Sequence, residues 1–315
     1  MKKALFATSA LVAAGLATSA SAAEWSSKVN GYWFVGIAAS DDDSGTDGIG
    51  ILRDGEIHFN ASLKADNGLT FKSRVELESF TSGDQIDENW ASVGGSFGTI
   101  KIGGDDDASY NNNVGIIYAP GARVGYYDAF SINTTGGAFT DGPSVGGDGL
   151  GIHYTSPSFN GFSAGFTYMP NSGIDNAADN NNVNFEANNF WAVGANFSTE
   201  VDGFGFGMSG GYTDAAGANN DTYTVGANLS AGGFKIAGTF EDDQTDEFAV
   251  GMQYSAGPMT IAGGYADDDG GDQTATGWLT YSIAPGVSGT VAVEYVEDAA
   301  NNEGLGGLAY LSLKF

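Results

Sequence analysis

The chain has 315 residues, with 11 Lys and Arg against 39 Asp and Glu, and a formal net charge of −28 at pH 7. So acidic a surface cannot neutralise phosphates, which excludes nucleic acid as a partner. The absence of cysteine excludes a disulfide framework and a thiolate metal site. Fifty glycines with only 6 prolines indicate a protein of strands and turns.

The first residues have the features of a cleaved export signal. The charged start "MKK" precedes the apolar run "ALFATSALVAAGLA", and small residues up to Ala23 offer a cleavage site. We therefore expect a signal peptide over 1–23 and one β domain over 24–315, in which nine basic residues against 39 acidic ones give a net charge of −30. No later apolar run reaches the roughly 20 residues of a membrane-spanning helix.

Segments of alternating apolar and polar residues recur along the rest of the chain. In "LTFKSRVELES", Phe71 and Val75 share one face, and Lys72 and Arg74 share the other. A period of two predicts β-strands. The predicted strands cover residues 25–39, 50–65, 69–80, 88–97, 99–104, 148–157, 162–170, 187–198, 203–213, 221–231, 234–241, 247–256, 258–266, 273–283, 286–297 and 304–315.

The connections between these strands alternate in length. Tight ones such as "DNG", "FNG" and "PG" take turns with longer ones rich in Asp and Asn, such as "SDDDSGTDG" and "ADDDGGD". Outer-membrane barrels have short periplasmic turns, longer outer loops and an even number of strands. We therefore expect an all-β fold, a 16-stranded antiparallel transmembrane β-barrel, with apolar residues facing lipid and small polar residues facing a wet lumen.

The last strand carries an apolar face that continues to the final residue. Leu311, Leu313 and Phe315 point one way, while Ser312 and Lys314 point the other. The ending "LAYLSLKF" resembles the assembly signal of the Gram-negative general porins, and "WASVGGSFGTIKIGG" is similar to the fourth and fifth strands of that family. The resemblance is strongest to the alphaproteobacterial branch and covers essentially the whole mature chain.

This resemblance implies a homotrimer of barrels that passes small hydrophilic solutes by diffusion. It implies further partners: outer-membrane lipid and lipopolysaccharide, and the machinery that assembles outer-membrane barrels. It also implies a third loop that folds into the lumen and narrows it, here over about 104–147.

Residues for a pore constriction are predicted from this loop and from strand parity, which is the face of the strand, inward or outward, that each alternate residue occupies. The predicted basic wall comprises Lys72, Arg74 and Lys101, with His58 and Lys64 on the second strand. The predicted acidic loop residues are Asp105, Asp106, Asp107 and Asp128, whereas Asp141 fits a solvated loop position. Loop acids that face wall bases would set up a transverse field. The excess of acid over the whole chain favours cation selectivity.

The sequence contains two further kinds of candidate site. Carboxylate runs at 41–43, 105–107 and 267–269 would attract a hard cation such as Ca²⁺. None has EF-hand spacing, so no calcium ion is placed and no other cofactor is expected. "GMSGG" at 207–211 matches a nucleophile elbow and "GFGMSG" at 205–210 a dinucleotide motif, but neither precedes the helix that its mechanism needs.

We therefore expect a channel without enzymatic activity. Two alternatives remain on the sequence alone: an outer-membrane β-barrel enzyme and a secreted calcium-binding β protein. An activity screen distinguishes the first from a channel, and solubility without detergent distinguishes the second.

Overall fold

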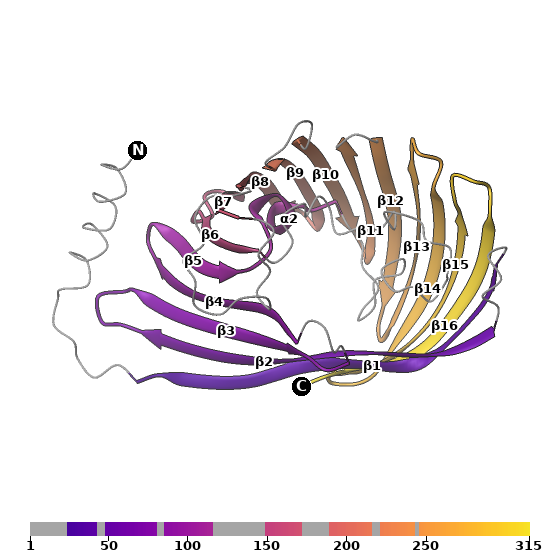
Figure 1. Ribbon diagram of the computed structural model, residues 1–315, viewed down its shortest axis with the longest axis horizontal. Coiled ribbons are helices and arrows are strands. Elements are labelled where there is room, and N and C mark those ends of the chain that lie inside the picture. The colour runs from indigo at the N-terminus through magenta and orange to yellow at the C-terminus, as the bar shows by residue number, and fades with distance from the viewer. Residues whose placement is uncertain are drawn as a thin grey trace.

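The computed structural model describes residues 24–42, 48–80, 85–115, 149–171, 189–215, 221–242 and 246–315. These residues form a closed barrel in which each strand pairs antiparallel with its neighbours in the chain, and β16 pairs with β1 (Figure 1). The predicted fold, a 16-stranded antiparallel barrel, is confirmed.

The ends of the sixteen strands differ from the predicted ends by no more than three residues. Their bounds are β1 Ser26–Asp42, β2 Gly48–Lys64, β3 Thr70–Glu78, β4 Ile86–Gly95, β5 Gly98–Gly104, β6 Leu150–Thr155, β7 Phe162–Met169, β8 Phe190–Val201, β9 Phe204–Ala215, β10 Asp221–Ala231, β11 Phe234–Asp242, β12 Asp246–Ala256, β13 Met259–Asp268, β14 Gln273–Ala284, β15 Val287–Glu297 and β16 Glu303–Lys314. A short helix, α2, spans Ala108–Asn112. No helix in the described part of the chain is long and apolar enough to cross a membrane.

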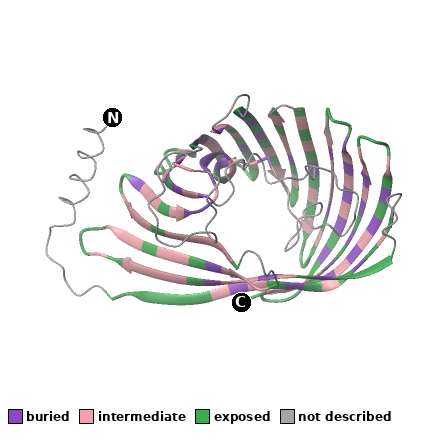
Figure 2. Ribbon diagram, in the orientation of Figure 1, coloured by how far each residue is buried: buried purple, intermediate pink, exposed green. Residues whose placement is uncertain are grey.

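The two faces of the barrel wall differ as the alternation predicts. Buried residues alternate with exposed ones along β10, and with intermediate or exposed ones along the first eight residues of β14 (Figure 2). Large apolar side chains on one face are exposed, among them Ile51, Val225 and Met252. Apolar side chains directed outward around a closed sheet are suited to contact with lipid.

Tight turns close the hairpins at one end of the barrel. Asp202 and Gly203 join β8 to β9 with φ angles of 53° and 81°, and Gly232 and Gly233 join β10 to β11 with 56° and 89°. Two successive positive φ angles define the type I′ turn, whose twist matches that of the flanking strands. The sequence signals "DG" and "GG" therefore fix the register of these hairpins.

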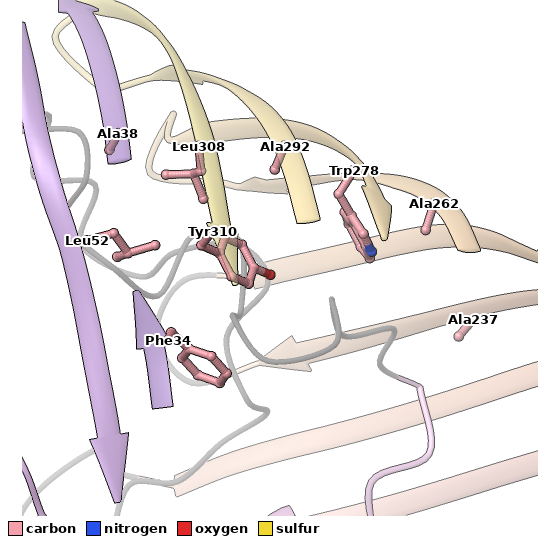
Figure 3. Close-up of a cluster of buried hydrophobic side chains, with 9 residues drawn as sticks. All are labelled: Phe34, Ala38, Leu52, Ala237, Ala262, Trp278, Ala292, Leu308 and Tyr310. Carbon is pink, nitrogen blue, oxygen red and sulfur yellow. The ribbon is translucent and has the colours of Figure 1, made fainter. Parts of the chain in front are cut away.

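The inner wall is not uniformly small and polar, which differs from the prediction. An apolar cluster covers part of it (Figure 3) and comprises Phe34, Ala38, Leu52, Ala237, Ala262, Trp278, Ala292, Leu308 and Tyr310. The rings of Phe34 and Tyr310 meet edge to face at 6.0 Å. Strand parity missed this cluster because β14 and β16 carry apolar residues on both faces, as the neighbours Trp278 and Leu279 show.

Candidate pore constriction

The segment after β5 enters the barrel and marks which face of the wall is interior. Helix α2 packs against β7, β8 and β9 on the inside of the ring (Figure 1). The Ser109 hydroxyl lies 3.2 Å from the Thr224 hydroxyl, and the Asn196 amide donates to Asn112 Oδ1 at 2.9 Å. Asn228 donates to the backbone carbonyl of Val114 at 2.7 Å. The beginning of the third loop therefore lies inside the barrel, as expected.

Glycines on the wall make room for this segment. A Cβ atom at Gly194 would lie 2.0 Å from the Ala108 carbonyl oxygen, and one at Gly211 would lie 1.9 Å from Ser109 Oγ. Any larger residue at either position would push α2 away from the wall. The glycine content of β8 and β9 thus serves the docking of the loop.

Strand register extends the interior face around the barrel to the predicted basic wall. Cross-strand partners in an antiparallel sheet share a face, and Lys72 is opposite Ser92, which is opposite Lys101. His58 lies opposite Glu76 and Lys64 opposite Thr70, on the same face as Arg74. The structure therefore places all of the predicted wall residues on the interior face.

Arg74 is held by a buried network on that wall. Its Nε forms an ion pair with Glu76, and its Nη2 lies 2.7 Å from His58 Nδ1. His58 Nε2 lies 2.7 Å from Glu56 Oε2 and 3.2 Å from Glu76 Oε2, and the Tyr32 hydroxyl donates to Glu56 Oε1 at 2.6 Å. Because a guanidinium only donates, Nδ1 of His58 must accept, and Nε2 carries the proton toward the two carboxylates.

This assignment bears on whether the network suits a metal ion. Glu56, His58 and Glu76 each offer a ligand atom within 4.8 Å of the others. A metal at His58 Nε2 would require the free electron pair there and a proton on Nδ1, where Arg74 already directs a donor. The residues therefore fit a hydrogen-bonded network and do not fit a metal site.

Lys101 pairs with a carboxylate that is close to it in the sequence and not with one on the opposite side of the lumen. It forms an ion pair with Asp105, four residues along the chain, and its Nζ lies 4.5 Å from the centre of the Trp90 ring. The expected arrangement, with loop acids facing wall bases over a gap, is therefore corrected for this pair. The two residues lie in contact because Asp105 follows directly after the end of β5.

The other predicted loop acids occupy different places. Asp107 is fully buried and caps α2, where its Oδ1 accepts from the backbone N–H groups of Ser109 and Tyr110 at 2.7 and 3.2 Å. The backbone carbonyl of Asp106 accepts from Asn111 at 2.8 Å. Asp128 lies outside the described residues, and so does Asp141. The role of Asp107 is thus a helix cap, which differs from the predicted role of a charge facing the pore.

Sequence reasoning missed the acids that hold the basic wall. Glu56 and Glu76 were not among the predicted site residues, although both have the strand parity of His58 and Arg74. That shared parity was the signal that could have identified them.

Ser209, the centre of the enzyme-like motif, lies within β9 and accepts from the backbone N–H of Val114 at 3.1 Å, so its hydroxyl positions the loop.

We expect Asp107→Asn to strengthen the docking of α2 at neutral pH. Burial raises the pKa of Asp107 to about 6, although hydrogen bonds from Tyr110 and Ser109 oppose the shift. The folded pKa lies above the usual value near 3.9, so stability falls as pH rises from about 4 to about 6 and stays low above it. Asn keeps the hydrogen-bond acceptor but carries no charge. The variant should therefore be more stable than wild type by up to about 3 kcal/mol at pH 8, and equally stable below about pH 4.

Hydrogen exchange at the amides of Ser109 and Tyr110 measures this effect as protection factors in wild type and variant at pH 4 and pH 8. Asp107→Ala is the control, because it removes the charge and the cap together, and protection in it is expected to be about 1 kcal/mol lower than in Asp107→Asn at both values. Lower protection in Asp107→Asn at pH 8 would contradict the prediction.

A closed barrel with an apolar outer face, a charged inner face and an inward-folded loop defines a membrane channel of the β-barrel class. Comparison with protein families agrees: the model of the Gram-negative porins matches residues 7–301. The chain belongs to this family, which places it in the outer membrane as a porin channel.

Solved structures with the same fold include several variants of Rhodopseudomonas blastica porin. A multiply substituted variant aligns with a TM-score of 0.63 and 18% identity, over 92% of this chain and 100% of that one. A second variant gives 0.64 and 17% over the same shares, and a triple mutant gives 0.61 and 19%. Comparison with curated proteins finds no match.

Proposed function

We propose that the chain forms a homotrimeric, non-enzymatic pore for passive diffusion of small hydrophilic solutes and ions, with a preference for cations. The observation that carries this proposal is the contrast between the two wall faces: charged side chains such as Arg74, Glu76 and Lys101 line the interior, while Ile51 and Met252 face outward. Export through a signal peptide over 1–23, assembly by the barrel machinery, and contact with outer-membrane lipid and lipopolysaccharide belong to the same proposal.

The preference for cations follows from charge. The chain carries a net charge of −28, and two of its wall bases, Arg74 and Lys101, are already paired with carboxylates. An excess of acidic over basic residues raises the local concentration of cations within a Debye length of about 8 Å at physiological salt. Because Arg74 and Lys101 are already neutralised, they offset little of this attraction for cations.

Reversal potentials in planar bilayers test the proposal. With KCl more concentrated on one side, we expect stepwise currents, grouped in threes, whose reversal potential shifts toward the potassium equilibrium potential. A shift toward the chloride equilibrium potential would contradict cation selectivity and leave the channel intact. Purified, folded protein that gives no conductance steps would contradict the channel itself.

A further inference from the structure

The lysines of the inner wall of β1–β5 fall into two groups. Lys101 is paired with Asp105, whereas the side chains of Lys28, Lys64 and Lys72 have no ion pair or hydrogen bond with the described residues. All three are exposed. Three uncompensated positive charges are notable in a chain with only 11 Lys and Arg.

Register brings these three lysines together. Lys72 on β3 lies opposite Ser62 on β2, and Lys64 lies two residues beyond Ser62 on the same face. Such diagonal neighbours are about 7–8 Å apart. Lys28 on β1 lies opposite Asn60, two residues before Ser62. The three ammonium groups therefore extend from three consecutive strands into one part of the lumen.

Two hollows lie beneath these side chains. One, of about 380 Å³, is bordered by Lys28 and Lys72, and the other, of about 350 Å³, by Lys64 and Lys72. Lys72 belongs to both. Their other lining side chains include the hydroxyls of Ser62, Ser92 and Thr99 but no carboxylate. Asp66, the acidic residue nearest to Lys64 in the sequence, lies in the turn after β2 and forms no ion pair with Lys64.

We propose that Lys28, Lys64 and Lys72 form a binding site for a phosphate group on the channel wall, near the end of the barrel with the tight turns. The inference rests on the proposed channel function, which brings solutes to this wall. Lysine ammoniums bind phosphate as point charges from several directions, and hydroxyls supply further hydrogen bonds. The nearby Arg74 is already occupied by Glu76, so the lysine ammoniums are the positive charges available to an anion at this part of the wall.

The site gives the pore a local anion-binding position within an acidic channel. Lys64 and Lys72 lie within about one Debye length of each other at physiological salt and act together on a bound dianion. Lys28, which is opposite Asn60 on the neighbouring strand, lies farther along the wall and adds a weaker attraction. Binding is expected to be weak and to weaken further as salt rises. Phosphate on one side of a bilayer should therefore reduce the cation current in a dose-dependent manner.

Calorimetric titration of folded protein in detergent at low salt tests the site. The probes are inorganic phosphate and a glycerol phosphate, which separate a free ion from a phosphate carried by an organic solute. Lys72→Gln is expected to weaken binding about tenfold, equivalent to about 1.4 kcal/mol. Lys28→Gln and Lys64→Gln should each weaken it less, and Lys72→Arg should retain most of the affinity. The matched control is Lys235→Gln on β11, which removes the same charge from the interior face elsewhere.

Unchanged phosphate affinity in Lys72→Gln would overturn the inference, as would an equal loss in Lys235→Gln. Loss in Lys72→Gln that is restored in Lys72→Arg supports it and excludes a folding defect. Wild-type channels that conduct cations but bind no phosphate would refute the site alone. A protein that binds phosphate through Lys72 without conducting would refute the channel alone.

Discussion

Deletion of Phe315 is expected to reduce assembled barrels in the outer membrane at least about tenfold, while export of the chain continues. The reason is closure: the backbone N–H of Phe315 donates to the Gly31 carbonyl and the N–H of Gly31 to the Phe315 carbonyl, both at 3.1 Å. The Phe315 ring also meets the Trp33 ring edge to face at 6.3 Å. The deletion removes this pair from the seam between β1 and β16 and leaves the backbone N–H and carbonyl of Gly31 without these partners, and unpaired backbone groups in lipid are costly.

Electrophoresis of unheated outer-membrane fractions measures this effect, because folded barrels migrate differently from unfolded chains. Phe315→Ala separates the two contributions, since it keeps the backbone pair and removes the ring. Leu305→Ala, at the far end of the same outward face, is the control and should assemble normally. A deletion variant found as heat-resistant oligomers at wild-type yield would show that the last residue is not an assembly signal.

Arg74→Gln is expected to have the largest effect on the pore itself. It leaves Glu76 without its guanidinium partner, so cation preference should rise and stability should fall. Breaking a fully buried ion pair costs about 3–5 kcal/mol, and because the Arg74 side chain is 29% exposed we expect about 2 kcal/mol after solvent screening.

Lys72→Gln is the matched comparison for this variant. It removes the same charge from the same strand, but Lys72 has no carboxylate partner among the described residues. It should therefore raise cation preference without lowering stability. Reversal potentials and thermal unfolding in detergent measure the two quantities. Equal stability of Arg74→Gln and Lys72→Gln would mean that the Arg74 network does not support the wall.

The sequence was sufficient for the barrel because the evidence for each strand is local. Period-two alternation gave the strand limits, and turns such as Asn160–Gly161 gave the hairpins. Parity then placed Lys72, Arg74 and Lys101 on the interior face, as the register confirms. The family resemblance added the inward loop, and the packing of α2 bears it out.

The partners of these charges could not be predicted in the same way. Parity gives the face of a side chain but not its rotamer or the neighbours that it contacts on that face, so the contact of Arg74 with both His58 and Glu76 remained hidden. Asp107 looked like a pore acid because three aspartates occur in a row. It became a helix cap because the next residues turn into α2. Constriction roles for Asp105, Asp106 and Asp128 remain predictions.

The most direct test of the channel account uses the absence of cysteine from the chain. Neighbouring positions on β12 face opposite ways: Met252 lies on the outer face with 56% exposure, and Gln253 pairs with Lys235 on the inner face. A charged, membrane-impermeant thiol reagent should reduce the current through Gln253→Cys channels and leave Met252→Cys channels unchanged. Block of Met252→Cys with no effect on Gln253→Cys would contradict the account, because the strand register would then be shifted by one residue and the inward and outward faces exchanged.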